Sequence, residues 1–126
     1  MATVLASSGC ASRYRVEGQA PAYAAVSKIK VRVNKTENRV LRLEVEHLAP
    51  PQRISPRYTN YAVWIAVPGV GLTKAGLLDY NDRRRRGTLE ATTPHSNFEV
   101  LLTLESDRSA TQPSSNVIVR KVVGRA

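Results

Sequence analysis

The residues that build most catalytic and metal sites are scarce in this sequence. Its only cysteine is Cys10, and its only histidines are His47 and His95. A single cysteine excludes a disulfide within the chain, and so few histidines, remote from that cysteine, offer no ligand spacing for zinc. Neither histidine stands in a nucleophile, phosphate-loop or paired-carboxylate motif. We therefore predict a protein that is not an enzyme, has no cofactor and carries both histidines solvated.

Long apolar runs and acidic residues are also few. No stretch approaches the roughly 20 consecutive apolar residues with which a helix spans a bilayer. Lys and Arg total 19 against 10 Asp and Glu, which gives a formal net charge of +9 in 126 residues. A chain of this length forms one domain. Its charge favours anionic partners such as nucleic acid, phospholipid headgroups or cell-wall polymers, and a surface that serves only solubility is the alternative.

Apolar and polar residues alternate along much of the chain. Residues 28–33 (KIKVRV) and 39–48 (RVLRLEVEHL) follow this pattern, which a strand with one buried and one solvated face requires. Residues 34–38 (NKTEN) have the composition and length of a hairpin loop. We therefore predict that these two runs are paired strands.

Other runs are predicted as short strands separated by turns. Residues 61–67 (YAVWIAV) are apolar on both faces, as in a central strand, and Trp64 lies on the face opposite Tyr61, where its indole N–H needs a partner or a wet edge. Residues 12–26 either add an edge strand or wrap the sheet, and residues 106–116 form a polar loop. The remaining strands are expected at residues 72–80, 88–93, 98–105 and 117–123.

About seven or eight short strands, with no convincing helix, predict an all-β fold. The expected architecture is an antiparallel immunoglobulin-like β-sandwich over residues 13–123, followed by a short tail at 124–126. A closed barrel is the alternative. The two cysteines of antibody domains are absent, so the likeness to those domains is one of architecture.

The small residues Ser7, Ser8 and Gly9 directly precede Cys10. This run is similar to the end of a bacterial lipoprotein signal, in which the cysteine is lipidated and becomes the mature N-terminus. Ser7 takes the place where that signal favours an aliphatic residue, and residues 1–9 include no basic residue. We expect residues 1–12 to be a signal remnant, with Cys10 the lipidation candidate, or else a flexible tail.

Several motifs follow in a set order from residue 61. They are YAVWIAV (61–67), AGLL (75–78), FEVLLTLES (98–106) and QPSSNVIV (112–119). In this order they resemble the extracytoplasmic domain of anti-sigma-K factors, although LTLES stands here where that family has VTLEP. The resemblance implies an envelope-facing bacterial module with an immunoglobulin-like fold and no catalytic residues. It does not imply sigma-factor binding, because the helical portion that performs this task is missing from the sequence.

Two basic groups are candidate contacts for an anion or a partner. The first is a row on one face of a predicted strand, formed by Lys28, Lys30 and Arg32. The second is the run Arg83, Arg84, Arg85 and Arg86. If this run is extended, at most two of its four side chains share one face.

The arginine run is also typical of a solvated hairpin tip. It follows Asn81-Asp82 and ends at Gly87, all of which are turn-forming residues, and Asp79 and Asp82 would offset part of its charge. A nucleic-acid binder would add exposed aromatic side chains for stacking. Only three tyrosines are free for this purpose by the predicted strand pattern, namely Tyr14, Tyr23 and Tyr80.

These observations favour a non-enzymatic binding or structural module of the bacterial cell envelope, held to the membrane only through a lipid on Cys10. Its basic surface would contact an anionic envelope component or an acidic protein. The alternatives are a nucleic-acid-binding β-domain that uses Arg83–Arg86 and a self-assembling surface or fibre subunit. Without a signal upstream of the lipoprotein-like segment, the expected location is the cytoplasm. The oligomeric state and the partner's identity are left open.

Overall fold

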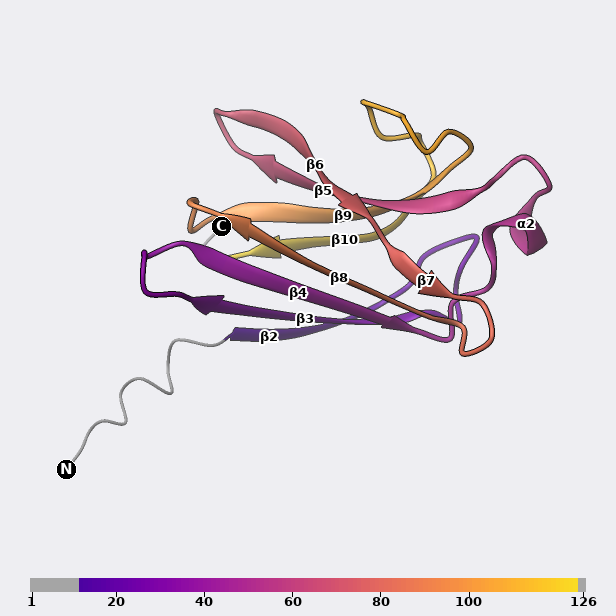
Figure 1. Ribbon diagram of the computed structural model, residues 1–126, viewed down its shortest axis with the longest axis horizontal. Helices are drawn as coiled ribbons and strands as arrows, with labels where there is room; N and C mark the ends of the chain where they lie inside the picture. The colour runs from indigo at the N-terminus through magenta and orange to yellow at the C-terminus, as the bar shows by residue number, and fades with distance from the viewer. Residues whose placement is uncertain (1–11, 125–126) are drawn as a thin grey trace.

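Two antiparallel sheets lie face to face in the computed structural model, which describes residues 12–124 (Figure 1). The five-stranded sheet has the order β2 (Ser12–Glu17), β3 (Val26–Val33), β4 (Arg39–Glu46), β8 (Arg86–Thr93) and β7 (Asp79–Asn81). The four-stranded sheet has the order β10 (Val117–Val123), β9 (Phe98–Glu105), β5 (Asn60–Val67) and β6 (Gly71–Leu77). A single helical turn, α2 (Pro51–Ile54), follows the proline pair after β4. The predicted all-β class is therefore confirmed, and the described strands form two sheets and not one closed barrel.

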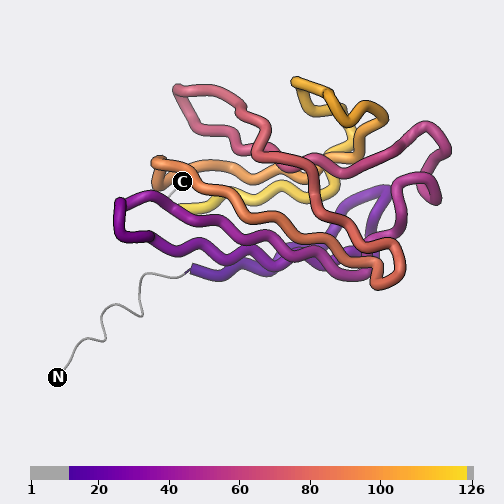
Figure 2. Tube along the Cα trace, in the orientation of Figure 1, coloured from indigo at the N-terminus to yellow at the C-terminus, as the bar shows by residue number. Residues whose placement is uncertain are grey.

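The predicted strand at residues 72–80 is wrong in one respect, because it comprises two strands in different sheets. β6 pairs with β5 and β7 pairs with β8. Leu78 lies between them, is buried, and donates its backbone N–H to the Tyr61 carbonyl at 2.9 Å. The chain thus changes sheet at one buried leucine, as the tube in Figure 2 lets the reader follow. Together with the edge strand β2, this division gives nine described strands.

One continuous core fills the space between the two sheets. It takes the inward-facing aliphatic residues of both, for example Leu43 and Val45 from β4 and Val100 and Leu102 from β9, all fully buried. Tyr61 lies in the same core, where its ring packs at 5.7 Å from that of Tyr80. Alternation in the sequence therefore predicts correctly which side of β3 and β4 is buried.

Trp64 lies on the other side of β5, on the outer face of the four-stranded sheet. It is fully buried there beside Ala62 and Leu101, and its indole N–H donates to Thr103 Oγ1 at 2.8 Å, which satisfies the predicted need for a partner. The loop of residues 106–116 is tied to this face, because Lys74 Nζ donates to the carbonyls of Arg108 and Ala110. The outer face of this sheet is therefore partly covered.

The outer face of the five-stranded sheet has a different character. Its side chains are long, charged and solvated, and only this sheet carries the predicted basic row on β3. We therefore describe the candidate site on this face.

Candidate functional site

The register of β2, β3 and β4 gathers basic side chains on one surface. Residues directly opposite each other on neighbouring antiparallel strands share a face of the sheet. Arg13 lies opposite Lys30 and Arg15 opposite Lys28, while Lys30 in turn lies opposite Arg42. We call these five residues, Arg13, Arg15, Lys28, Lys30 and Arg42, the basic face.

Like charges are direct neighbours in two rows of the basic face. One row has three cations in succession, in the order Arg13, Lys30 and Arg42, before it reaches Glu90 on β8. The next row has two cations and one anion, in the order Arg15, Lys28 and Glu44. Like charges directly opposite each other in a sheet lower its stability, so the arrangement costs free energy that the fold alone does not require.

Glu44 is the one carboxylate among the side chains that line the shallow depression on this face. Its Oε2 accepts from Arg42 Nε at 3.1 Å, and its Oε1 lies 3.6 Å from Nη2 of Arg86 on β8. The hydrogen bond from Arg42 and the charges of nearby arginine and lysine groups lower the pKa of Glu44, although burial acts in the opposite direction. Glu44 therefore stays ionised at neutral pH and neutralises part of the face.

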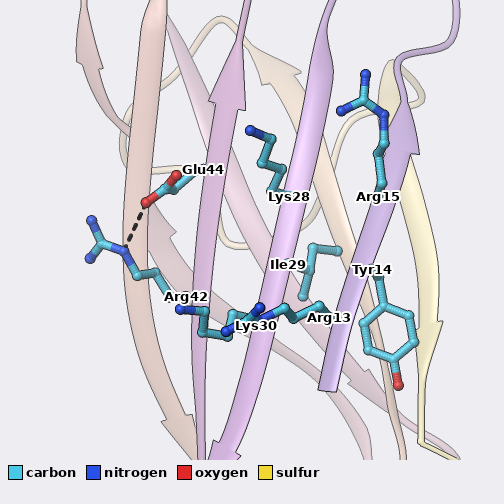
Figure 3. Close-up of a pocket in the computed structure, with 8 residues that line it drawn as sticks. All are labelled: Arg13, Tyr14, Arg15, Lys28, Ile29, Lys30, Arg42 and Glu44. Carbon is cyan, nitrogen blue, oxygen red and sulfur yellow. Dashed lines mark hydrogen bonds and ion pairs between the residues drawn. The ribbon is translucent and has the colours of Figure 1, made fainter. Parts of the chain in front are cut away.

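Most of the remaining positive charge is unpaired. Within residues 12–124 no carboxylate lies within 4.0 Å of Arg13, Arg15 or Lys30, and Lys28 only reaches Glu46 Oε1 at 4.0 Å. The side chains of Arg13 and Lys30 lie alongside each other in the middle of the face, and Arg42 and Glu44 are joined at its border (Figure 3). They surround an open depression of about 510 Å³.

The sequence-predicted residues divide between this face and its surroundings. Lys28 and Lys30 line the depression, while Arg32 lies on the same face two residues closer to the β3–β4 turn, opposite Val40. Of the arginine run, Arg86 contacts Glu44, and Arg83, Arg84 and Arg86 line a neighbouring depression together with Arg42. Cys10 lies outside the described residues.

Arg83, Arg84 and Arg85 lie in the β7–β8 turn, as predicted, and Arg86 is the first residue of β8. Arg83 and Arg84 are exposed at the tip of the turn, and the Arg84 amide donates to Asn81 Oδ1 at 3.1 Å. Arg85 takes the positive φ of 54° that closes the turn, so Gly87 does not have the role expected from the sequence. Gly87 lies inside β8, where an added Cβ would come within 2.3 Å of Leu78 Cδ2. Asp79 and Asp82 line one depression with Arg83, Arg84 and Arg86, although neither acid forms an ion pair within 4.0 Å among the described residues.

Two further expectations need correction. His47 follows the end of β4 with a φ of 59°, so it lies in a bend and not on a strand face. Tyr80 is not free for stacking, because its ring packs against Tyr61 and its hydroxyl donates to the Leu48 carbonyl at 2.5 Å. This burial raises the pKa of Tyr80. Of the three available tyrosines, Tyr23 is the one with a largely exposed ring, at 76%.

Sequence reasoning missed Arg13, Arg15 and Arg42 as members of the site. The signal was present in part, since Arg13 and Arg15 alternate with apolar residues just as Lys28 and Lys30 do. Their position opposite the lysines depends on the register between β2 and β3, which the sequence does not specify.

In chemical terms the surface is a cluster of cations and offers no constellation for catalysis. Among residues 12–124, no group of three or more His, Cys, Asp or Glu side chains is placed to hold a metal ion. No helix of the described chain is long and apolar enough to cross a membrane. The fold and the site thus define a two-sheet antiparallel β protein with a cationic sheet face. Comparisons with protein-family models, with curated proteins and with solved structures gave no match.

Proposed function

We propose that the chain is a non-enzymatic, immunoglobulin-like module of the bacterial cell envelope, and that its basic face binds an anionic polymer. The like-charge row Arg13, Lys30 and Arg42 is the observation that carries this proposal. An anionic group seated between these side chains would convert their mutual repulsion into attraction.

The immunoglobulin-like part of the proposal is supported by the strand order. The sequence β3-β4-β8-β7 in one sheet and β10-β9-β5 in the other corresponds to the orders A-B-E-D and G-F-C of immunoglobulin sandwiches. β2 adds an edge strand to the first sheet and β6 adds one to the second. The envelope location is supported by the resemblance to anti-sigma-K factors and by the small residues before Cys10, where a lipid would anchor the module.

Protection against aggregation does not account for the basic face. Charged side chains on an edge strand prevent pairing with another chain, and this explains Arg13 and Arg15 on the edge strand β2. Lys30 and Arg42 lie on β3 and β4, which have hydrogen-bonded neighbours on both sides. Cations on interior strands protect no sheet edge, so ligand binding explains the presence of Lys30 and Arg42 better than protection against aggregation does.

The shape of the basic face favours a polymer over a compact ligand. Neighbouring strands are about 4.8 Å apart, and residues two apart on a strand are separated by about 6.6 Å. The cations therefore form a flat lattice that can contact successive charges of a chain. The one aromatic residue in the lining of the depression is Tyr14, whose side chain packs against the core between the sheets, so stacking on nucleic-acid bases would add little here.

The experiment compares two triple variants of the full chain that lose the same charge. The test variant is Arg13→Gln, Lys30→Gln and Arg42→Gln. The control is Arg57→Gln, Arg83→Gln and Arg84→Gln, three exposed cations outside the basic face, of which Arg83 and Arg84 line a neighbouring depression with Arg42. Binding of labelled inorganic polyphosphate is titrated at several salt concentrations. We expect the test variant to bind at least tenfold more weakly and its salt slope to fall by about 2, while the control changes much less.

Three results would count against this assignment. Equal losses in the two variants would show that net charge, and not the basic face, sets the affinity. A larger loss in the control, measured with single-stranded DNA, would support the nucleic-acid alternative through the β7–β8 turn. Tighter binding of poly-glutamate than of polyphosphate would indicate an acidic protein as the partner.

A further inference from the structure

The exposed aliphatic side chains of this protein gather at one end of the sandwich. Among residues 12–124 five large hydrophobic side chains are exposed, and four of them are aliphatic: Val70 at 69%, Val122 at 47%, Leu72 at 40% and Val33 at 37%. We call these four residues the apolar end. The fifth is Tyr23, which lies in the β2–β3 connection at the opposite end.

The strand register and the turns place these four residues at the same end of the sandwich, and Val70, Leu72 and Val122 line one groove there. Val33 is in the last pair of β3 with β4, before their turn, and Val70 is in the β5–β6 turn. Leu72 and Val122 are each one pair away from the end of their ladders. Figure 1 shows the β3–β4, β5–β6 and β8–β9 turns at this same end, where β2 also begins.

The β5–β6 turn extends freely into solvent. An added Cβ on Gly69 or Gly71 would meet no atom within 4 Å, and the turn is closed by a hydrogen bond from the Val70 amide to the Val67 carbonyl at 3.0 Å. A groove of about 700 Å³ runs beside it towards β10, with Leu72, Phe98 and Val122 in its lining. Val70 can therefore enter an apolar phase without any unpacking of the core.

Cations surround this end, and few acids accompany them. The β3–β4 hairpin carries Arg32, Lys35 and Arg39 there, with Glu37 as its acid. No carboxylate among the described residues lies within ion-pair distance of these three cations. The nearest acid on the groove side, Glu99, is already paired with Arg120 at 3.2 Å.

We propose that the apolar end docks on a bilayer that contains anionic lipids. The side chains of the apolar end enter the boundary between headgroups and acyl chains, and the cations of the β3–β4 hairpin contact lipid phosphates. The exposed valine and leucine side chains come from three separate segments, namely β3, the β5–β6 hairpin and β10. The unpaired cations of the β3–β4 hairpin thus favour an anionic lipid surface over a second copy of this basic protein.

The proposal agrees with the place where a lipid anchor would be attached. The lipidation candidate Cys10 is two residues before Ser12 in the sequence, and Ser12 begins β2 at this same end of the sandwich. The apolar end would then face the membrane that holds the lipid, independently of whether the basic face binds a polymer.

The test uses the full, unlipidated chain and sedimentation with vesicles of phosphatidylglycerol and phosphatidylethanolamine. The test variant is Val70→Ser with Leu72→Ser, and the matched control is Tyr23→Ser, which removes an exposed hydrophobic side chain at the opposite end. We expect the test variant to bind vesicles at least tenfold more weakly, and the control to bind as the wild type does. Polyphosphate binding should be unchanged in both variants, which separates this proposal from the proposed function.

A second measurement reports membrane insertion directly, and it can be interpreted even if Val70→Ser with Leu72→Ser lowers the stability of the fold. With Cys10→Ser as background, Val70→Cys or Tyr23→Cys carries a polarity-sensitive fluorophore. A blue shift with anionic vesicles at position 70, and none at position 23, is expected. The proposal is wrong if neither position responds, or if the wild type does not sediment with anionic vesicles. It is also wrong if Val70→Ser with Leu72→Ser only converts a dimer into a monomer, because the apolar end would then be covered by a second copy.

Discussion

Replacement of Lys30 by glutamine should stabilise the fold while it weakens binding to a polyanion. Lys30 has cations directly opposite it on both sides, Arg13 on β2 and Arg42 on β4. An unfavourable cross-strand pair costs about 0.2–1 kcal/mol, and solvent exposure puts these two pairs towards the lower values. Lys30→Gln should therefore raise the free energy of unfolding by about 0.5–1 kcal/mol, which corresponds to about 2–4 °C in the melting temperature.

The chain contains a matched control on the same strand. Lys28 is equally a solvated lysine of β3, but it lies opposite one cation, Arg15, and one anion, Glu44, and its Nζ is 4.0 Å from Glu46 Oε1. Repulsion from Arg15 is therefore offset by the two carboxylates, so Lys28→Gln should leave the melting temperature unchanged or lower it slightly. Both variants are melted by circular dichroism at about 10 mM salt, where the Debye length is about 30 Å, and again at about 1 M, where it is about 3 Å.

The salt dependence decides whether the reasoning holds. If Arg13, Lys30 and Arg42 repel one another, the increase in melting temperature caused by Lys30→Gln disappears at high salt. A Lys30 variant that is less stable than the wild type at low salt, or no different from the Lys28 variant, would refute it. Polyphosphate affinity is measured on the same samples and should fall for Lys30→Gln. A variant that is more stable than the wild type but binds polyphosphate more weakly is expected where a surface serves ligand binding at the expense of stability.

The other predictions concern single contacts. Glu44→Gln should tighten polyphosphate binding several-fold, because it frees Arg42 and Arg86 from their contacts with this carboxylate. In the wild type, the contribution of these ion pairs to the free energy of unfolding should be present above about pH 4.5 and be lost as the pH falls through the lowered pKa of Glu44, which acid titration measures. Thr103→Val should destabilise the fold by about 1–3 kcal/mol in urea unfolding, because the indole N–H of Trp64 is left buried without its acceptor. Gly87→Ala should lower the free energy of unfolding by about 1–3 kcal/mol, because the new Cβ would overlap Leu78. An unchanged urea midpoint for Thr103→Val or for Gly87→Ala would contradict the prediction for that variant.

The sequence predicts the strands well, for a physical reason. β3, β4, β5, β8, β9 and β10 each begin within two residues of their predicted starts. Burial of one face imposes a period of two on the residues of β3 and β4, and burial of both faces makes β5 a continuous apolar run. Such a signal is local, so no knowledge of neighbouring strands is needed to detect it.

Features that depend on two distant segments were not predictable in this way. The change of sheet at Leu78 requires the Tyr61 carbonyl, which is on another strand, to accept its amide proton. The charged row requires β2 to lie opposite β3 in one particular register. Alternation shows that Arg13 and Lys30 are on the solvated faces of their strands, but not that they are neighbours. The four arginines of the run are consecutive, so the sequence alone identifies them as a cluster. The cations of the basic face are far apart in the chain, so only the fold identifies them as one.

Partners are expected to contact the faces and ends of this sandwich, and not its strand edges. Each of the four edge strands carries a feature that opposes pairing with another chain. β2 has two solvated arginines, and β7 is only three residues long. β6 and β10 are both irregular, since the β5–β6 ladder shifts its register after Val63 and the β9–β10 ladder shifts between Val117 and Val119. Assembly into a fibre by strand addition would have to overcome these features, whereas a polymer on the basic face and a lipid surface at the apolar end require no change in the sheets.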